Sequence, residues 1–169
     1  MTAETAQVPR TPPRVLVRTF WILHRAAYRL TGGRLGLGRP DSGARFGMLR
    51  LSTIGRRSGQ QRTTMLGYFE DGDNLVTMAM NGWADAEPAW WLNLQARPDT
   101  TVDLPDGRRR VRARAATGAE RDRLWATFSN YPGWGDDIDA LASRRSRETA
   151  VVVLEPAKTT KLEEARHGR

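Results

Sequence analysis

The chain has 169 residues, which is enough for one domain with a sizeable hydrophobic core. Its 27 Lys and Arg residues against 19 Asp and Glu residues give a formal net charge of +8, which favours an acidic ligand, a nucleic acid or an anionic membrane surface as partner. The absence of cysteine excludes thiol catalysis and zinc–thiolate sites, and the two histidines argue against a histidine-based metal site or a Ser-His-Asp triad. We therefore expect no metal site, and an enzyme of this composition would take its chemistry from a bound cofactor.

The N-terminal region is predicted to hold a disordered tail at residues 1–13 and a helix at residues 14–30, which opens a single domain of residues 14–156. Residues 157–169 form a charged tail. The chain lacks a signal-peptide core and any run near the roughly 20 apolar residues that span a membrane, so a cytoplasmic location is expected. Helical spacing aligns Arg14, Arg18, Arg25 and Arg29. This stripe is either the solvated face of a packed helix, which we favour, or a surface that contacts an anionic membrane or the tail of a bound cofactor.

Three strands are predicted next, at residues 46–54, 63–70 and 74–80, because β-type residues there are separated by turn signals. Asp71-Gly72-Asp73 is a hairpin signal between the second strand and the third. The three segments are therefore expected to form an antiparallel meander.

The turn between the first two of these strands concentrates glycine and arginine. Its glycines permit positive φ and a close approach of backbone N–H groups to a ligand. Arg56, Arg57 and Arg62 add forked donors that suit phosphate or carboxylate. The residues alone leave two interpretations open, an anion-binding cradle or a solvated basic hairpin turn.

A loop and a helix follow the third strand. Asn81–Trp83 opens the loop, and Asp85 is a candidate N-cap for a helix that ends at about Ala96. Trp90 and Trp91 are adjacent on this helix, so the two side chains are not expected to face one pocket. We expect Trp90 at a site and Trp91 in packing.

A second hairpin is predicted from residues 100–104 and 108–116. In its second strand, alternation with period two gives one face of arginines and one of mostly small or apolar residues. The basic face comprises Arg108, Arg110, Arg112 and Arg114. An alternative hypothesis follows, a nucleic-acid-binding module that would bind oligonucleotides tightly and in a strongly salt-dependent way.

The last part of the chain adds two helices and a strand. The capping-box pattern Thr117–Glu120 predicts a helix to about Asn130, followed by a short helix at residues 136–143 and a buried strand at residues 148–155. About six strands in antiparallel pairs, with three or four helices between them, indicate an α+β fold or a small β-barrel with helical insertions. The βαβ alternation of a dinucleotide-binding fold is missing.

Taken together, six segments resemble the deazaflavin-dependent (coenzyme F-420) nitroreductase and quinone reductase family, whose members are small split β-barrels. The segments are LSTIGRRSGQQR (51–62), YFEDGD (68–73), NG (81–82), PAWWLNLQARP (88–98), YPG (131–133) and VVVLEP (151–156). The resemblance implies an α+β split β-barrel of about six mainly antiparallel strands with helical insertions and an N-terminal helix.

The same resemblance implies a cofactor and a reaction. The cofactor is reduced coenzyme F-420, an 8-hydroxy-5-deazaflavin that carries a phosphodiester and an oligoglutamate tail. The reaction is hydride transfer to a small organic acceptor, which in the family is a quinone, a nitro compound or an activated enone or lactone. Two alternatives remain beside it: a split barrel that uses flavin mononucleotide, and a non-catalytic deazaflavin-binding protein.

Residue roles also follow from the resemblance. The phosphate and tail are implied to contact Arg56, Arg57, Ser58, Arg62, Thr63 and Thr64. The ring and its neighbouring wall are implied to involve Met78, Met80, Asn81, Gly82, Pro88, Trp90 and Asn93. The acceptor pocket is implied to involve Met80, Trp83, Trp90, Tyr131 and Trp134, with Tyr131 as the catalytic proton donor.

The sequence also departs from the nitroreductase pattern on the acceptor side. Met80 replaces a serine, Trp83 replaces a glycine, and Trp134 and Asp137 replace tyrosines. The cofactor side is therefore expected to follow the family, while the acceptor is selected by residues particular to this chain. Nitroimidazole reduction is not expected.

Overall fold

The computed structural model describes residues 36–41, 45–131 and 137–157. The chain divides into two compact units, and the features below belong to the second, Leu37–Arg169. The predicted tail at residues 1–13 and the predicted helix at residues 14–30 lie outside the described residues, and so do Trp134 and nearly all of the C-terminal tail.

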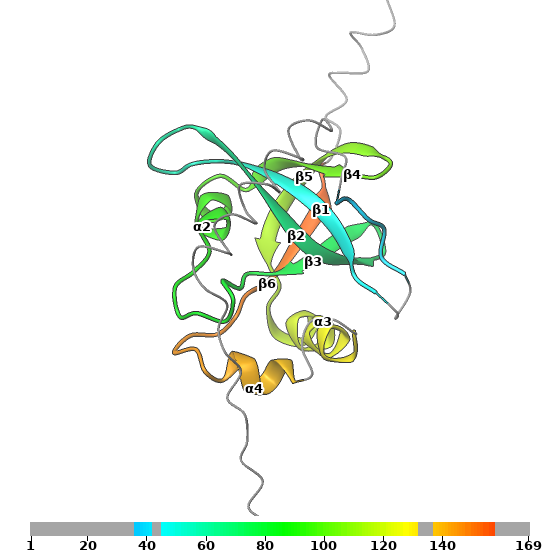
Figure 1. Cartoon of the computed structure of the whole chain (residues 1–169), viewed down its shortest axis with the longest axis vertical. Coiled ribbons are helices and arrows are strands. Elements are labelled where there is room, and N and C mark those ends of the chain that lie inside the picture. Colours follow the sequence, from blue (N-terminus) through cyan, green and yellow to red (C-terminus); the bar gives the residue numbers. More distant parts are fainter. Residues whose placement is uncertain (1–35, 42–44, 132–136, 158–169) are drawn as a thin grey trace, which may run out of the picture. The chain divides into compact units, whose positions relative to one another are not determined.

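Six antiparallel strands close into a barrel in the order β1-β2-β3-β6-β5-β4 (Figure 1). The strands are β1 (Gly47–Ile54), β2 (Gln61–Asp71), β3 (Asn74–Met78), β4 (Asp99–Leu104), β5 (Gly107–Ala115) and β6 (Val151–Pro156). The predicted α+β barrel of about six antiparallel strands is therefore confirmed.

Strand β2 changes its neighbour along its length. Gln61–Tyr68 pairs with β1, whereas only Phe69–Asp71 pairs with β3. The first half of β2 thus continues past the end of β3, and with β1 it forms the long hairpin that extends from the barrel in Figure 1. Arg62, which was predicted in the turn, therefore lies in this strand opposite Thr53.

Three helices are present among the described residues: α2 (Ala89–Ala96), α3 (Gly118–Asn130) and α4 (Ile138–Ala142). In Figure 1, α2 lies beside the barrel, and α3 and α4 lie together on another side of it. No helix in the described part of the chain is long and apolar enough to cross a membrane.

One predicted helix start and one predicted capping box need correction. Helix α2 begins after Pro88, and Asp85 is not its N-cap, because the Asp85 carboxylate accepts hydrogen bonds from the N–H and the hydroxyl of Ser146, both at 2.6 Å. Thr117 does precede α3, but the capping box does not form: Thr117 makes no side-chain cap, and Glu120 binds Arg114 at 2.6 and 2.7 Å. In each case the carboxylate binds a side chain or backbone group outside the helix instead of the backbone N–H groups at the helix start.

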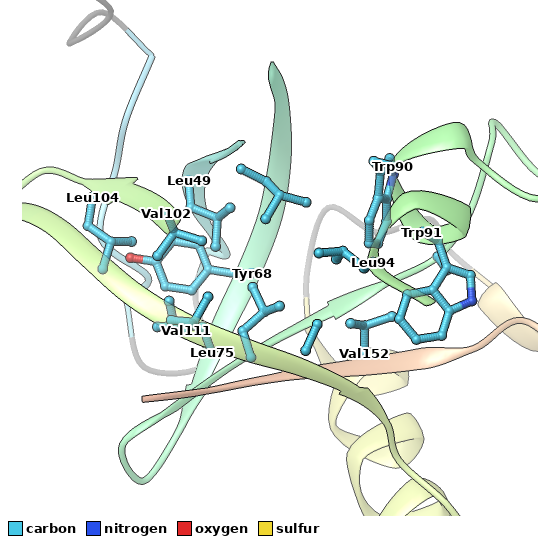
Figure 2. Close-up of a cluster of buried hydrophobic side chains, with 14 residues drawn as sticks. Leu49, Tyr68, Leu75, Trp90, Trp91, Leu94, Val102, Leu104, Val111 and Val152 are labelled. Atoms are coloured by element: carbon cyan, nitrogen blue, oxygen red, sulfur yellow. The ribbon is translucent and has the colours of Figure 1, made fainter. Parts of the chain in front are cut away.

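The first hydrophobic cluster fills the barrel and includes side chains of α2. Alternation along the strands directs Leu49 and Leu51 of β1 and Val111 and Ala113 of β5 into this cluster. Figure 2 shows the tryptophans and Leu94 of α2 entering the same cluster opposite Tyr68. Helix α2 is therefore part of the barrel core, which fixes its position relative to β1.

The second cluster lies on the outer face of β3 and β6, beneath α3 and α4. Phe69, Met78 and Val153 alternate with the inward residues of their strands and pack against α3 and α4. The ring of Phe128 in α3 meets the ring of Phe69 edge-on, with 4.7 Å between centroids. The alternation of side chains therefore gives these strands two apolar faces. One face packs inside the barrel, and the other packs against α3 and α4.

The buried Tyr68 hydroxyl makes stability depend on alkaline pH. Tyr68 is 1% exposed, and burial, with a smaller contribution from the Glu70 carboxylate, raises its pKa from 10.0 to about 12. The unfolded chain loses this proton at a lower pH than the folded protein does. The stabilisation is therefore complete below pH 10 and is lost as the pH rises through about 12, by up to about 3 kcal/mol. Urea unfolding at about pH 9 and about pH 11 measures it, and Tyr68→Phe should remove this part of the pH dependence.

Candidate functional site

A cavity of about 750 Å³ lies between the β1–β2 turn, the first half of β2, the loop after β3 and the start of α2. It gathers residues from these four segments that were predicted as cofactor contacts: Arg56, Arg57, Ser58, Arg62, Thr63, Thr64, Met80, Asn81, Gly82, Pro88, Trp90 and Asn93. The lining also includes Gly55 of the predicted cradle turn, and residues that the sequence did not single out for a site: Thr53, Met65, Leu66, Glu87 and Ala89. Segments far apart in sequence thus form one concave surface.

The β1–β2 turn is closed by its own backbone. The Gly55 N–H donates to the Gln60 carbonyl and the Gly59 N–H donates to the Gly55 carbonyl, both at 2.8 Å. Gly59 has φ 66°, and a Cβ added at Gly55 would lie 2.6 Å from the Ser58 Oγ. The positive φ at Gly59 favours glycine there, and at Gly55 a larger residue would displace the Ser58 hydroxyl.

Asn93 of α2 holds the turn and the end of β1 through two side-chain hydrogen bonds. Its side-chain oxygen accepts the Arg56 N–H at 3.0 Å, and its amide nitrogen donates to the Thr53 hydroxyl at 3.2 Å. Asn93 is 5% exposed, so these bonds are made away from water, where an unmade bond is costly. Asn93 was predicted as part of the wall beside the ring; it lines the cavity and also connects α2 to the turn.

The three arginines at the tip of the β1–β2 hairpin, two in the turn and one at the start of β2, have no acidic partner among the described residues. Arg56, Arg57 and Arg62 form no ion pair there, and the Arg62 guanidinium makes only a long hydrogen bond of 3.4 Å to the Gln60 side chain. All three are exposed and line the cavity. The turn therefore presents uncompensated positive charge at one side of the cavity, as the cradle interpretation requires.

The arginines of the β4–β5 hairpin behave in the opposite way. Five ion pairs there have distances of 2.6 to 2.7 Å: Arg108–Asp103, Arg109–Asp106, Arg112–Asp99, Arg114–Glu120 and Arg114–Glu155. Burial raises the pKa of Asp103, but hydrogen bonds from Arg108 and Arg50 outweigh it and hold that pKa below its ordinary value. The basic face expected on β5 exists, but its charge is largely compensated, which weakens the nucleic-acid hypothesis.

The other side of the cavity is formed by the loop after β3. The Asn81 carbonyl accepts the Ala84 N–H at 3.0 Å around a turn in which Gly82 has φ 56° and Trp83 has φ 61°. These angles are those of a type I′ turn, in which glycine is the usual residue. Trp83 is the one non-glycine residue of the described chain with positive φ, so this wall contains local backbone strain.

Three predicted site residues lie off the cavity lining. Met78 faces the second cluster because strand alternation directs it outward, and it is 2% exposed. Trp83 and Tyr131 pack on the same cluster, and the Tyr131 hydroxyl donates to the Asp41 carbonyl at 3.2 Å. Of the predicted acceptor-pocket residues, Met80 and Trp90 line the cavity, whereas Trp83 and Tyr131 lie off its lining and pack with Met80 against the second cluster. The assignment of Tyr131 as proton donor stays a prediction.

The cavity residues that sequence reasoning missed fall into two groups, those that strand register could have indicated and those that it could not. Thr53, Met65 and Leu66 follow from the register, because the β1–β2 pairing carries the cavity surface along the hairpin beyond the turn. Glu87 gives no local signal, since its partner Arg145 lies far along the chain. A register could have been inferred from alternation, but a long-range ion pair could not.

The fold is a closed antiparallel barrel with an arginine-lined cavity beside an aromatic helix, which is the architecture of a split-barrel protein. A family model described as F-420H(2)-dependent quinone reductase matches residues 21–156. An F-420H(2)-dependent quinone reductase of Mycobacterium tuberculosis is 36% identical over 137 residues, which cover 78% of this chain and 87% of the relative. The chain belongs to the F-420H(2)-dependent quinone reductase family, and it is a deazaflavin-dependent reductase.

Solved structures agree with this fold. A structure described as an F-420-H2-dependent reductase has a TM-score of 0.55 and 24% identity, and the match covers 64% of this chain and 93% of that one. A structure described as a domain-swapped dimer has a TM-score of 0.59 and 24% identity, with 82% of this chain and 99% of that one covered. At these identities the likeness concerns the barrel architecture alone.

The cavity fits the family's coenzyme by the chemistry of its donors. A phosphodiester and a carboxylate tail need several cationic or N–H donors that are not already engaged, and the three arginines at the tip of the β1–β2 hairpin meet that need. A flat ring needs an apolar and aromatic wall, which Met80, Pro88 and Trp90 supply across the same cavity. The two requirements are met within one continuous surface.

Proposed function

We propose that this protein reduces a quinone with a hydride from reduced deazaflavin coenzyme held in the cavity. The observation that carries the proposal is the division of this cavity: uncompensated arginines on the β1–β2 turn face an apolar wall that contains Met80 and Trp90. The first side suits the charged end of the coenzyme, and the second suits flat, apolar rings. The quinone class is supported by the family description and by the M. tuberculosis relative.

The proposed roles of the cradle residues follow from their positions. Arg57 and Arg62 hold the phosphate and the tail with forked hydrogen bonds, and the hydroxyls of Ser58, Thr63 and Thr64 add donors along the same edge. Asn93 keeps the turn at a fixed height above α2. These residues bind and orient the coenzyme but take no part in bond making.

The proposed role of the apolar wall is to orient the ring and the acceptor and to exclude water. The bound coenzyme supplies the hydride, and the reduced quinone then needs one proton to become the hydroquinone. Met80 and Trp90 shield the reacting faces, which limits loss of the hydride to side reactions. The position of Tyr131 off the cavity lining favours water as the source of the proton.

The proposal is tested by binding and turnover with the same protein. We expect coenzyme F-420 to quench tryptophan fluorescence with an affinity at least about tenfold greater than that of flavin mononucleotide. Under anaerobic conditions, reduced coenzyme should be oxidised when a soluble naphthoquinone is added, and much more slowly when a nitroimidazole is added. Tight coenzyme binding without oxidation by any quinone would instead support the non-catalytic deazaflavin-binding protein. Preferred binding of flavin mononucleotide would contradict the cofactor side of the proposal.

A further inference from the structure

The wall segment of the cavity, residues 79–88, is tied to the segment that follows α4, residues 145–150. The Ala79 N–H donates to the Ala150 carbonyl at 2.9 Å, and Ser146 donates twice to the Asp85 carboxylate at 2.6 Å. The wall is therefore attached near its beginning and near its middle to a part of the chain that contributes nothing to the cavity lining.

Arg145 joins the two ends of this wall from behind. Its side chain is 0% exposed, and Nη1 donates to the Thr149 hydroxyl at 2.6 Å and to the Ala79 carbonyl at 3.3 Å. Nη2 lies 3.8 Å from Oε1 of Glu87, which lines the cavity. One guanidinium thus contacts the residue before Met80 and the residue before Pro88.

The hydrogen bonding of this buried pair is incomplete. Oε2 of Glu87 and both Nε and Nη2 of Arg145 are buried without a hydrogen-bond partner. A buried ion pair with unsatisfied atoms stabilises a fold less well than apolar side chains of similar size. Stability alone therefore does not account for an arginine at this position, which lies directly behind the functional wall.

The wall also contains backbone strain that its surroundings must hold in place. Trp83 has φ 61° between the two points that Arg145 contacts. A bulky residue stays in the left-handed region only where neighbouring contacts impose it. The contacts from residues 145–150 are those that hold the ends of this strained segment.

We propose that Arg145 is a positioning residue that sets the distance between the apolar wall of the cavity and the arginine cradle. It acts through the Ala79 carbonyl and the Glu87 carboxylate, and it touches neither coenzyme nor acceptor. This inference deepens the proposed hydride transfer and rests on it for the kinetic measurement. A displaced wall would leave the cradle intact, so loss of Arg145 should affect turnover more than coenzyme affinity.

The test compares Arg145→Met with Arg144→Met, an exposed neighbour that receives the same substitution. We expect Arg145→Met to lower kcat with the naphthoquinone by about 10- to 100-fold, the effect of misplacing reacting groups by about an ångström. Its coenzyme dissociation constant should stay within about threefold of the wild-type value, because the cradle carries the tail. The induced circular dichroism of the bound oxidised coenzyme should change in Arg145→Met and not in Arg144→Met.

Two further variants separate a positioning role of Arg145 from a requirement for it in folding. Arg145→Lys retains a charged donor for the Ala79 carbonyl and should recover much of the turnover. If Arg145→Met does not fold, the double variant Arg145→Met/Glu87→Gln removes both buried charges and should fold with the same loss of kcat. A folded variant with wild-type kcat and unchanged dichroism would overturn the positioning role. If the wild-type protein reduces no quinone, the proposed acceptor is wrong, while affinity and dichroism still decide the role of Arg145.

Discussion

Replacement of both Arg57 and Arg62 by alanine is expected to weaken coenzyme binding by about 100-fold or more and to leave the fold intact. A charge-assisted hydrogen bond contributes about 1–3 kcal/mol, and each arginine is free to make at least one with the phosphate or the tail. Neither side chain forms an ion pair within the described chain, so neither must give up an acidic partner on binding. Both are exposed, and their loss should change unfolding by less than about 0.5 kcal/mol.

The measurement is a tryptophan-quenching titration at increasing ionic strength, with Arg112→Ala as the matched control. Arg112 is also exposed on a strand, but it is paired with Asp99 at 2.7 Å and lies off the cavity lining. The wild-type affinity should fall with salt more steeply than that of the double variant, since the variant has lost two screened charge contacts. Equal dissociation constants for the wild type and the double variant would refute the cradle. If Arg112→Ala lost as much coenzyme affinity as the double variant, the loss would be an effect of net charge and not of the cradle.

Replacement of Phe128 by alanine is expected to destabilise the fold by about 3–5 kcal/mol, the usual cost of removing a fully buried aromatic ring. Phe128 is 0% exposed, and its ring meets that of Phe69 at 4.7 Å. Leu124 and Phe128 are the two buried residues of α3, so the helix loses half of its anchor to the barrel. The cost is a large part of the roughly 5–15 kcal/mol that stabilises an ordinary domain.

Urea unfolding followed by tryptophan fluorescence measures this loss, with Phe128→Leu as the control. The leucine keeps most of the apolar volume and should cost less than about 1.5 kcal/mol. Coenzyme affinity of the folded fraction should be unchanged, because no residue of α3 lines the cavity. A midpoint within error of the wild type would show that α3 does not depend on this contact.

Local pattern sufficed to predict most of the strands but not all of their ends. Period-two alternation in β5 predicted its arginine face, and the turn signals at Asp71–Asp73 predicted the β2–β3 hairpin. The predicted start of β2 was too late in the sequence, because pairing with β1 continues through Gln61 and Arg62, where the residue types resemble a turn. Cross-strand pairing here overrides local propensity.

In the candidate site, too, features formed by neighbouring residues could be predicted from the sequence, whereas features formed by long-range contacts could not. Gly55, Arg56 and Arg57 are neighbours, so the sequence displays their shared turn directly. What makes the turn arginines distinctive is that they lack acidic partners while those of β5 have them, and that contrast depends on which carboxylates fold nearby. Asp85, the predicted cap of α2, likewise has a partner that the local sequence does not show, Ser146, and the helix begins after Pro88.

The change of neighbour along β2 has a consequence for solubility. Residues 61–66 are paired with β1 on one side, and within the described chain no strand pairs with their other side. Such an edge offers free backbone groups to a strand of another molecule, and it is a recognised starting point for aggregation. Thr63, Thr64, Met65 and Leu66 of this edge line the cavity, so a molecule that fills the cavity also covers the edge. Ligand binding and protection from self-association therefore depend on the same stretch of strand.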